Sequence, residues 1–228
     1  MDFVQFQNEI KKLFKTIPES FFEQIQTYKS FLQSENKKYN LTRLDQEETV
    51  YESYFFESLV PYQNVQFTKG MKVLDIGSGS GIPGILLKLM FPEIELTILE
   101  VTTKKVKFMQ DLAKKLNIKV NFLNQRAEDI NNQQRETFDL VTSRAVAELK
   151  VLLEISTPYL KVKGLLVEPK SQNFKQELDA TLNIIKSLNL KQLKSDTYQT
   201  KYFHHVFYFQ KNAKTNKKYP REWKQIIS

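Results

Sequence analysis

The chain has no cysteine and only six glycines among its 228 residues. The lack of cysteine excludes disulfide bridges, metal sites with cysteine ligands and catalysis by a thiolate. No apolar run approaches the roughly 18 residues that a membrane-spanning helix needs. The first residues mix acidic with apolar side chains, unlike a signal peptide. We therefore expect a soluble cytoplasmic protein that has no metal site and no membrane partner.

Positive charge is unevenly distributed along the chain. The net charge is +8, and residues 171–228 alone hold 11 basic and 4 acidic groups. Near the end, Lys217, Lys218 and Arg221 surround Tyr219. Lysine and arginine neutralise phosphates, and aromatic rings stack on bases. Residues 211–228 are therefore a candidate RNA-binding tail, and the alternative is a solvated tail that only keeps the protein soluble.

The first 65 residues have the pattern of packed helices. Aromatic and aliphatic residues recur every three or four positions from Phe3 to Phe14 and again from Phe21 to Leu32, and Pro18 separates the two runs. This spacing predicts two amphipathic helices. The polar segment 36–43 is turn-like, and a helical pattern resumes over residues 46–60. We interpret residues 1–65 as a helical cap on the rest of the chain.

Residues 66–210 alternate short β-branched runs with amphipathic stretches, which is typical of parallel β-α-β units in a doubly wound α/β sheet. The predicted strands are Lys72–Ile76, Leu96–Leu99, Val120–Leu123, Asp139–Thr142 and Leu165–Glu168. The predicted helices are Pro83–Met90, Lys104–Leu116, Leu149–Leu160 and Phe174–Leu188. The last two runs, Leu190–Tyr198 and His204–Phe209, lack an intervening helix, which predicts a hairpin with the final strand antiparallel at one edge of the sheet.

Four of the six glycines lie where the first predicted strand meets the first predicted helix: Gly77, Gly79, Gly81 and Gly84. Glycine permits positive φ and lets a ligand approach the backbone. In a doubly wound sheet the ligand lies beyond the carboxyl ends of the strands. The cluster therefore predicts a nucleotide-type ligand at this turn, and the alternative is a glycine-rich turn in another α/β fold.

Three other positions distinguish the possible ligands. A dinucleotide-binding turn has glycine or alanine where this chain has Ile82. Asp75 precedes the first glycine by two residues, where it would repel a pyrophosphate and attract the sulfonium and ammonium groups of S-adenosylmethionine. Glu100 closes the second strand, where a carboxylate accepts hydrogen bonds from ribose hydroxyls. S-adenosylmethionine is therefore the predicted cofactor, with contacts at Asp75, Gly77, Gly79, Gly81 and Glu100.

The ends of the third and fourth strands carry further candidates. Ala127 leaves room for the adenine ring, and Glu128 or a neighbouring backbone group can accept from its amine; for Glu128 the alternative is a solvated loop acid. Arg144 follows the fourth strand, where reacting groups concentrate. It is the candidate catalytic residue, as a bidentate partner for the methionine carboxylate, a phosphate or a base. A structural ion pair is the alternative for Arg144.

Missing motifs limit the methyl acceptor. Carbon methylation of a pyrimidine proceeds through a cysteine adduct, which this chain cannot form. Methylation of an exocyclic amine commonly uses an Asn/Asp-Pro-Pro-aromatic motif after the fourth strand, where this chain has Ser-Arg-Ala-Val-Ala at residues 143–147. Guanine N7 has a lone pair and no proton, so positioning and electrostatic stabilisation suffice. The residues therefore favour an acceptor of this type.

The chain resembles the GidB/RsmG family of bacterial 16S ribosomal RNA guanine-N7 methyltransferases. The matching segments are Asn40–Thr42, Glu57–Leu59, Leu74–Gly84, Arg126–Glu128, Thr142–Ala147 and Lys218–Arg221. The resemblance implies a class I methyltransferase fold, S-adenosylmethionine as donor, and a guanine in the decoding-centre hairpin of 16S rRNA as acceptor. It implies cofactor contacts at Gly77, Ile82, Ala127, Glu128 and Arg144, and the ribose at Glu100. Arg144 and Arg221 are then candidates for contact with the RNA or the methionine carboxylate.

The chain departs from the family pattern at three places. Ser53-Tyr54 replaces a usual Lys-His pair, Glu57 replaces an aspartate, and Ile82 stands where phenylalanine or leucine is common. We expect a monomer that binds 16S rRNA or a small-subunit particle through Lys217, Lys218, Tyr219 and Arg221. The alternatives are a class I methyltransferase for another RNA, a small molecule or a protein, and an RNA-binding module that has lost its cofactor.

Overall fold

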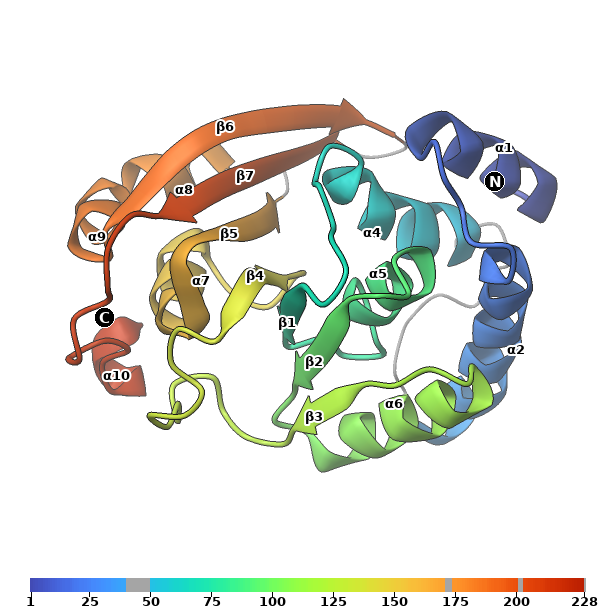
Figure 1. Cartoon of the computed structure of the whole chain (residues 1–228), viewed down its shortest axis with the longest axis horizontal. Coiled ribbons are helices and arrows are strands. Elements are labelled where there is room, and N and C mark those ends of the chain that lie inside the picture. The colour runs from blue at the N-terminus through green and yellow to red at the C-terminus, as the bar shows by residue number, and fades with distance from the viewer. Residues whose placement is uncertain (40–49, 171–173, 201–202, 228) are drawn as a thin grey trace.

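A seven-stranded sheet forms the centre of the molecule in the computed structural model, which describes residues 1–39, 50–170, 174–200 and 203–227 (Figure 1). The strands are β1 Lys72–Ile76, β2 Glu95–Leu99, β3 Asn121–Leu123, β4 Phe138–Ser143, β5 Leu160–Lys170, β6 Leu190–Gln199 and β7 Phe203–Lys211. Their order in the sheet is β3-β2-β1-β4-β5-β7-β6. The first five strands pair in parallel, which confirms the doubly wound α/β prediction.

The hairpin at the end of the sheet is also confirmed, with one difference in its order. β7 runs antiparallel to both β5 and β6. It inserts between them, so the outermost strand is β6 and not the final strand. The order of the strands reverses between β1 and β4, and a ligand is therefore expected beyond the carboxyl ends of these two strands.

Three helices connect the parallel strands, and two more precede the hairpin. They are α5 Gly84–Met90, α6 Thr103–Lys115, α7 Leu149–Ser156, α8 Phe174–Asp179 and α9 Leu182–Ser187. The prediction of a single helix over Leu149–Leu160 is wrong at its end, because Pro158 lacks an N–H group and would clash with the preceding turn. The chain forms a short 3-10 turn at Thr157–Tyr159 instead. The predicted helix Phe174–Leu188 is also divided, since Thr181 turns back to donate to the Leu178 carbonyl.

The cap consists of α1 Phe3–Leu13, α2 Phe21–Tyr39, a π-helix at Val50–Phe56, α4 Glu57–Leu59 and a 3-10 turn at Val60–Tyr62. Asp2 caps α1 and forms a capping box with Gln5. Because α2 continues to Tyr39, the turn predicted from residue 36 begins later than expected. The motif Asn40–Thr42 and the start of the helix predicted over residues 46–60 lie outside the described residues.

Alternate residues of the strands face two separate cores. Val73 of β1 belongs to the first core, which also holds Phe55 of the cap together with residues of α1, α2, α5 and α6. Leu74 belongs to the second core, with α7 and with Tyr219 and Ile226 of the C-terminal segment. This alternation follows from the period of two in a strand. The cap and the C-terminal segment therefore pack on opposite faces of the sheet.

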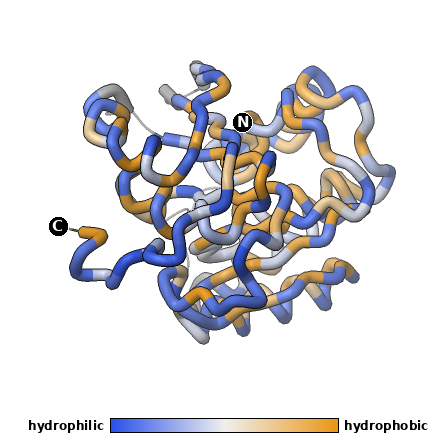
Figure 2. Tube along the Cα trace, turned by 60° about the vertical axis from the view of Figure 1, so that its left-hand side comes forward, coloured by the Kyte–Doolittle hydropathy of each residue, from blue (hydrophilic) through white to orange (hydrophobic). Residues whose placement is uncertain are grey.

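The C-terminal segment follows β7 and ends in the short helix α10, Trp223–Ile226. In Figure 2 this part of the chain is mostly hydrophilic, and hydrophobic colour returns only near the C-terminus. Among the described residues, every helix is too short or too polar to cross a membrane.

Candidate functional site

The glycine turn has a backbone that other residues would strain. Gly77, Gly79 and Gly81 have φ values of +70°, +63° and +107°. A Cβ atom on Gly84 would lie 2.7 Å from Oδ2 of Asp75, so this position needs glycine for a close approach. A Cβ atom on Gly79 would meet nothing closer than 4.0 Å, and a side chain there would extend into open space. The backbone of the turn is therefore uncrowded at Gly79.

Asp75 lies beneath this turn. The sequence predicts a cofactor contact for it, but the carboxyl group is fully buried. It accepts a hydrogen bond from the Ser78 hydroxyl and another from the Gly84 amide at 2.8 Å. Burial raises the pKa of Asp75 to about 7. Through these contacts Asp75 holds the turn against the first residue of α5; its predicted contact with the cofactor stays a prediction.

Glu100 lies at the end of β2, where the sequence predicts the ribose contact. One carboxylate oxygen accepts from the Gly79 amide at 3.1 Å and the other from the Thr102 amide at 2.9 Å. The side chain thus connects the glycine turn to the start of α6. Glu100 also lines a hollow in the surface.

This hollow, which we call the strand-end hollow, opens at the carboxyl ends of the first four strands. Gly77, Glu100, Ala127 and Val146 line it from the segments that follow β1, β2, β3 and β4. The predicted sites Gly77, Glu100, Ala127 and Glu128 are thus brought together. Ile82 is not, because it packs against the first core.

The segment after β3 forms one side of the hollow. Ala127 is buried, and its carbonyl accepts a hydrogen bond from the Tyr159 hydroxyl at 2.9 Å. Glu128 is paired with Arg126 by a short ionic hydrogen bond. The lining also includes Trp223, which comes from the C-terminal segment. Sequence reasoning placed Trp223 only in a basic aromatic tail, because no local pattern shows that the tail returns to this hollow.

Arg144 does not line the strand-end hollow. Its guanidinium group donates to the carbonyls of Ser53 at 2.7 Å and Tyr54 at 3.3 Å, and to the Ser58 hydroxyl. Nη2 of Arg144 lies 3.9 Å from a carboxylate oxygen of Glu57. Burial lowers the pKa of Arg144, and the carboxylate of Glu57 opposes this shift. Arg144 therefore joins the end of β4 to the cap, which is the structural alternative stated above; a catalytic role remains a prediction.

The cap also contacts the glycine turn directly. The Tyr28 hydroxyl donates to the Ser80 carbonyl at 2.6 Å, and the Tyr54 hydroxyl is hydrogen-bonded to the Ser80 side chain. Burial raises the pKa of Tyr54 to about 12, so this hydroxyl stays protonated. Tyr54 replaces a basic residue of the family pattern, and here it holds the turn. From the sequence, Tyr28 was part of a predicted packing stripe and Tyr54 a departure from the family pattern, so neither was expected to hold the glycine turn.

The four predicted RNA-binding residues divide into two pairs. Lys217 and Lys218 are exposed. Tyr219 is buried, and its carbonyl accepts a hydrogen bond from Arg135. Arg221 holds the fully buried Glu154 through its side chain, with Nη2 to Oε2 at 2.6 Å and Nε to Oε1 at 2.8 Å, and through its backbone amide. Tyr219 and Arg221 are therefore engaged within the protein, a correction of the simple view that all four contact RNA.

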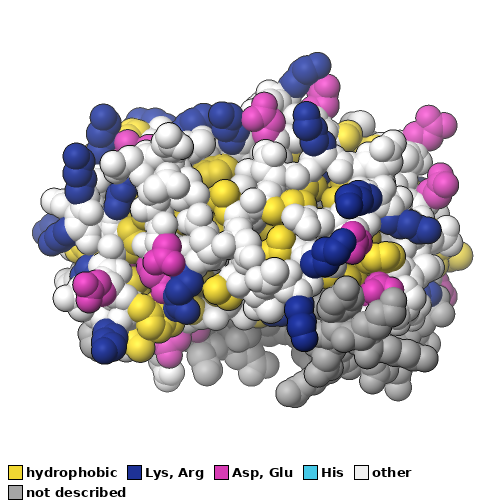
Figure 3. All heavy atoms as spheres, turned by 90° about the horizontal axis from the view of Figure 1, so that it is seen from below, with side chains coloured by type: hydrophobic (Ala, Val, Ile, Leu, Met, Phe, Trp, Pro, Cys, Tyr) yellow, Lys and Arg dark blue, Asp and Glu magenta, His cyan; other side chains and the backbone are white. Residues whose placement is uncertain are grey.

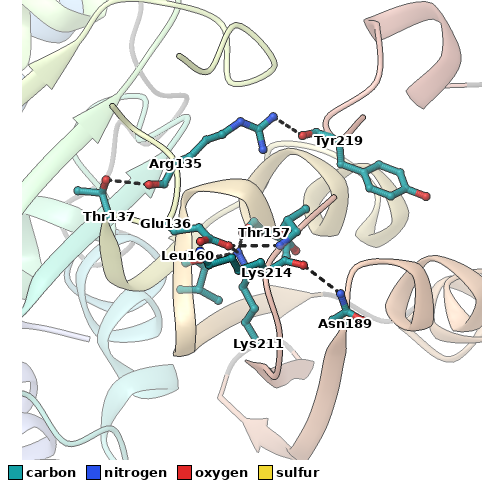
Figure 4. Close-up of polar contacts among 10 residues, drawn as sticks. Arg135, Glu136, Thr137, Thr157, Leu160, Asn189, Lys211, Lys214 and Tyr219 are labelled. Atoms are coloured by element: carbon teal, nitrogen blue, oxygen red, sulfur yellow. Dashed lines mark hydrogen bonds and ion pairs between the residues drawn. The ribbon is translucent and has the colours of Figure 1, made fainter. Parts of the chain in front are cut away.

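Figure 4 shows how the start of the C-terminal segment is fixed. The fully buried ammonium group of Lys211 donates to Glu136 at 2.9 Å and to the carbonyls of Leu160 at 2.7 Å and Thr157 at 3.2 Å.

Figure 3 shows basic side chains interspersed with acidic ones on one face of the molecule, so this face has no uniform positive patch. Within the described ranges, no group of three His, Asp or Glu side chains is arranged to hold a metal ion.

Comparison with known proteins gives consistent matches. Residues 22–206 match the family model "GidB: rRNA small subunit methyltransferase G". A protein of Malacoplasma penetrans named ribosomal RNA small subunit methyltransferase G is 47% identical over 209 residues, which cover 90% of this chain and 88% of that protein. A protein of the same name from Ureaplasma parvum is 40% identical, over 97% of this chain and 96% of its own length.

A solved structure supports the fold. A SAM-dependent methyltransferase from Aquifex aeolicus superimposes with a TM-score of 0.58 at 17% identity, covering 75% of this chain and 97% of its own. At this identity the likeness concerns the fold alone.

Proposed function

The chain belongs to the rRNA small subunit methyltransferase G family, and from this premise we propose that it methylates 16S rRNA with S-adenosylmethionine as donor. The proposed acceptor is N7 of a guanine in the decoding-centre hairpin. The single observation that carries the proposal is the match to the family model over residues 22–206, which includes the whole sheet except the end of β7.

The strand-end hollow fits the proposed cofactor. Gly79 leaves space at the backbone of the turn that any Cβ atom would reduce. Glu100 offers a carboxylate where ribose hydroxyls would lie, and the small side chain of Ala127 leaves room for a ring. Gly77, Glu100, Ala127 and Glu128 would hold the cofactor. When bound, it would supply a methyl group on a cationic sulfur: the lone pair of the acceptor would bond to the methyl carbon as the carbon–sulfur bond breaks and S-adenosylhomocysteine leaves, with no proton transferred.

The acidic residues of the hollow suit a reaction without a general base. Both oxygens of Glu100 accept backbone amide hydrogens, and Glu128 is paired with Arg126. These contacts give both carboxylates a role in binding and positioning, and the proposed acceptor needs no general base. Guanine N7 carries no proton, so holding the base in line with the methyl group and excluding water are sufficient.

Exposed lysines near the C-terminus would contact the RNA backbone. Lys217, Lys218 and Lys224 are exposed on the segment that also reaches the hollow. Each phosphate contact adds to the salt dependence of RNA binding. A ribosomal substrate implies action in the cytoplasm, and we expect a monomer, which sedimentation analysis tests.

Methylation of small-subunit RNA tests the proposal. The protein is incubated with labelled S-adenosylmethionine and either naked 16S rRNA or small-subunit particles, and the product is cleaved chemically at N7-methylguanine. We expect one cleavage site, in the decoding-centre hairpin. Label found only at other atoms or in other RNAs would contradict the N7 proposal. Equal activity on small molecules or proteins, unaffected by RNA, would favour the alternative substrate classes.

A further inference from the structure

The only tryptophan of the chain is Trp223, and it lines the strand-end hollow from the C-terminal segment. Trp223 is far from the strand ends in sequence, but it shares the hollow with Gln125, Ala127 and Glu128, which follow β3. Its side chain is 37% exposed, although it is among the largest apolar side chains of the protein. A large aromatic ring at the rim of a hollow is available to a ligand.

Several contacts fix the segment that carries this ring. Arg221 is bound to the buried carboxylate of Glu154. Arg135 donates to the carbonyl of Tyr219, as Figure 4 shows. Ile226, one turn after Trp223 on the same helix, is buried in the second core. Because residues three apart share one side of a helix, the buried Ile226 directs the Trp223 side of α10 toward the protein.

Arg126 orders the ring within the hollow. The guanidinium carbon of Arg126 lies 5.0 Å from the centre of the Trp223 ring, within the range of a cation–π interaction. The same guanidinium is bound to Glu128. Trp223, Arg126 and Glu128 thus form a connected row along the side of the hollow that the sequence predicts for adenine.

We propose that Trp223 is a cofactor-binding residue, and that the C-terminal segment forms the wall of the pocket against which the adenine ring of S-adenosylmethionine packs. The proposal rests on the assignment of the strand-end hollow to the cofactor. Aromatic rings stack on nucleobases and gain affinity from each such contact. The segment that would carry the RNA-binding lysines is then also part of the cofactor pocket.

Binding of S-adenosylhomocysteine to the purified full chain tests this proposal by calorimetry. Trp223→Leu, which removes the aromatic ring, should weaken binding roughly tenfold. Trp223→Phe, which keeps an aromatic face, should recover most of the affinity. Ile227→Ala is the matched control, because Ile227 lies on the same helix and is 57% exposed; it should bind as the unaltered protein does. Thermal unfolding without ligand shows whether each variant is folded.

Tryptophan emission supplies a second measurement, because it comes from this one side chain. Titration with S-adenosylhomocysteine or with 5′-deoxyadenosine should change the emission equally at saturation, since both carry adenine. Normal affinity of Trp223→Leu would overturn the proposal. If Glu100→Ala loses affinity while Trp223→Leu does not, the cofactor binds in the strand-end hollow but does not contact Trp223. If both variants bind normally, the assignment of the hollow to the cofactor is itself wrong. Loss of RNA affinity alone would assign Trp223 to the RNA.

Discussion

The cap and the C-terminal segment both lie outside the β-α-β part of the chain, yet they are attached to it by different forces. The cap is attached by aromatic contacts, of Phe14 with Phe91 and of Phe31 with Phe108. Within the cap, Phe55 contacts Phe6, Tyr28 and Tyr51. The C-terminal segment is held by charged hydrogen bonds at Lys211, the last residue of β7, and at Arg221, together with the burial of Tyr219 and Ile226 in the second core. Each region then places side chains at the site: Tyr28 and Tyr54 at the glycine turn, and Trp223 at the hollow.

This difference has a consequence for stability. Burial of aromatic surface stabilises through packing that is insensitive to salt and pH. A buried ion pair contributes little net stability, but loss of one partner leaves the other charge unsatisfied. We therefore expect the cap to resist changes of solution conditions and the C-terminal segment to depend on single charged side chains.

The largest effect is expected from Phe55→Ala in the cap. Phe55 is fully buried, so its removal should cost about 4 kcal/mol, from lost burial and the cavity that remains. Denaturant unfolding measures the loss, which should be the same at low and high salt. Val4→Ala, at a 62% exposed position of α1, is the control and should be neutral. A loss below 1 kcal/mol would contradict a cap that shares its core with the sheet.

Lys211→Met tests the other region and should cost about 3 kcal/mol. The change keeps the length of the side chain but leaves Glu136 and two carbonyls without their donor. Lys214→Met, at an exposed lysine three residues further along, should leave the unfolding free energy unchanged. If the two variants unfolded alike, the charged attachment of the C-terminal segment would be refuted.

Arg144→Ala should cost about 2 kcal/mol, because it removes the hydrogen bonds that join β4 to the cap. The structure thus supports the structural role of Arg144 as a connection between regions, and its catalytic role is a separate prediction. Differential scanning calorimetry and cofactor titration are measured together. An unchanged melting temperature with complete loss of methylation would restore the catalytic interpretation of Arg144.

A smaller, pH-dependent effect is expected at the sheet between the two regions. Burial raises the pKa of Glu168 to about 8. A carboxyl group whose pKa is raised in the folded state stabilises the fold below its unfolded pKa and loses this contribution as pH rises toward 8. Glu168→Gln should therefore gain stability relative to the unaltered protein by roughly 1 kcal/mol per unit between pH 6 and 8. Parallel pH profiles for both proteins would contradict the buried, protonated carboxyl.

The smallest effect on stability is expected from Lys217→Glu with Lys218→Glu, because both side chains are exposed. RNA affinity should nevertheless fall about tenfold and become less dependent on salt, since phosphate contacts are lost. Lys115→Glu with Lys119→Glu makes the same charge change near the amino end of β3 and should leave RNA binding almost unaltered. Filter binding at several salt concentrations measures both pairs.

Local patterns predicted most of the fold and only part of the site. The short apolar run at residues 72–76 and the glycines that follow are local signals, and the structure has the strand and turn there. Pairing of Arg221 with Glu154 joins residues 67 positions apart, so no local pattern could show it. No local pattern could show either that Trp223 lines the strand-end hollow. The contacts of Asp75 could not be predicted for a different reason: its place two residues before the glycines fits both a ligand contact and a buried support of the turn, and only the structure shows its hydrogen bond to Gly84.

A crystal structure with S-adenosylhomocysteine bound tests the central claim most directly, because it locates the cofactor relative to both flanking regions. We expect the ribose hydroxyls to lie at Glu100 and the adenine between Ala127 and Trp223. We expect the sulfur to be directed from the turn at Gly79 toward the end of β4. A ligand that lies elsewhere, or one that binds in the hollow while Trp223 stays out of contact with it, would contradict the account.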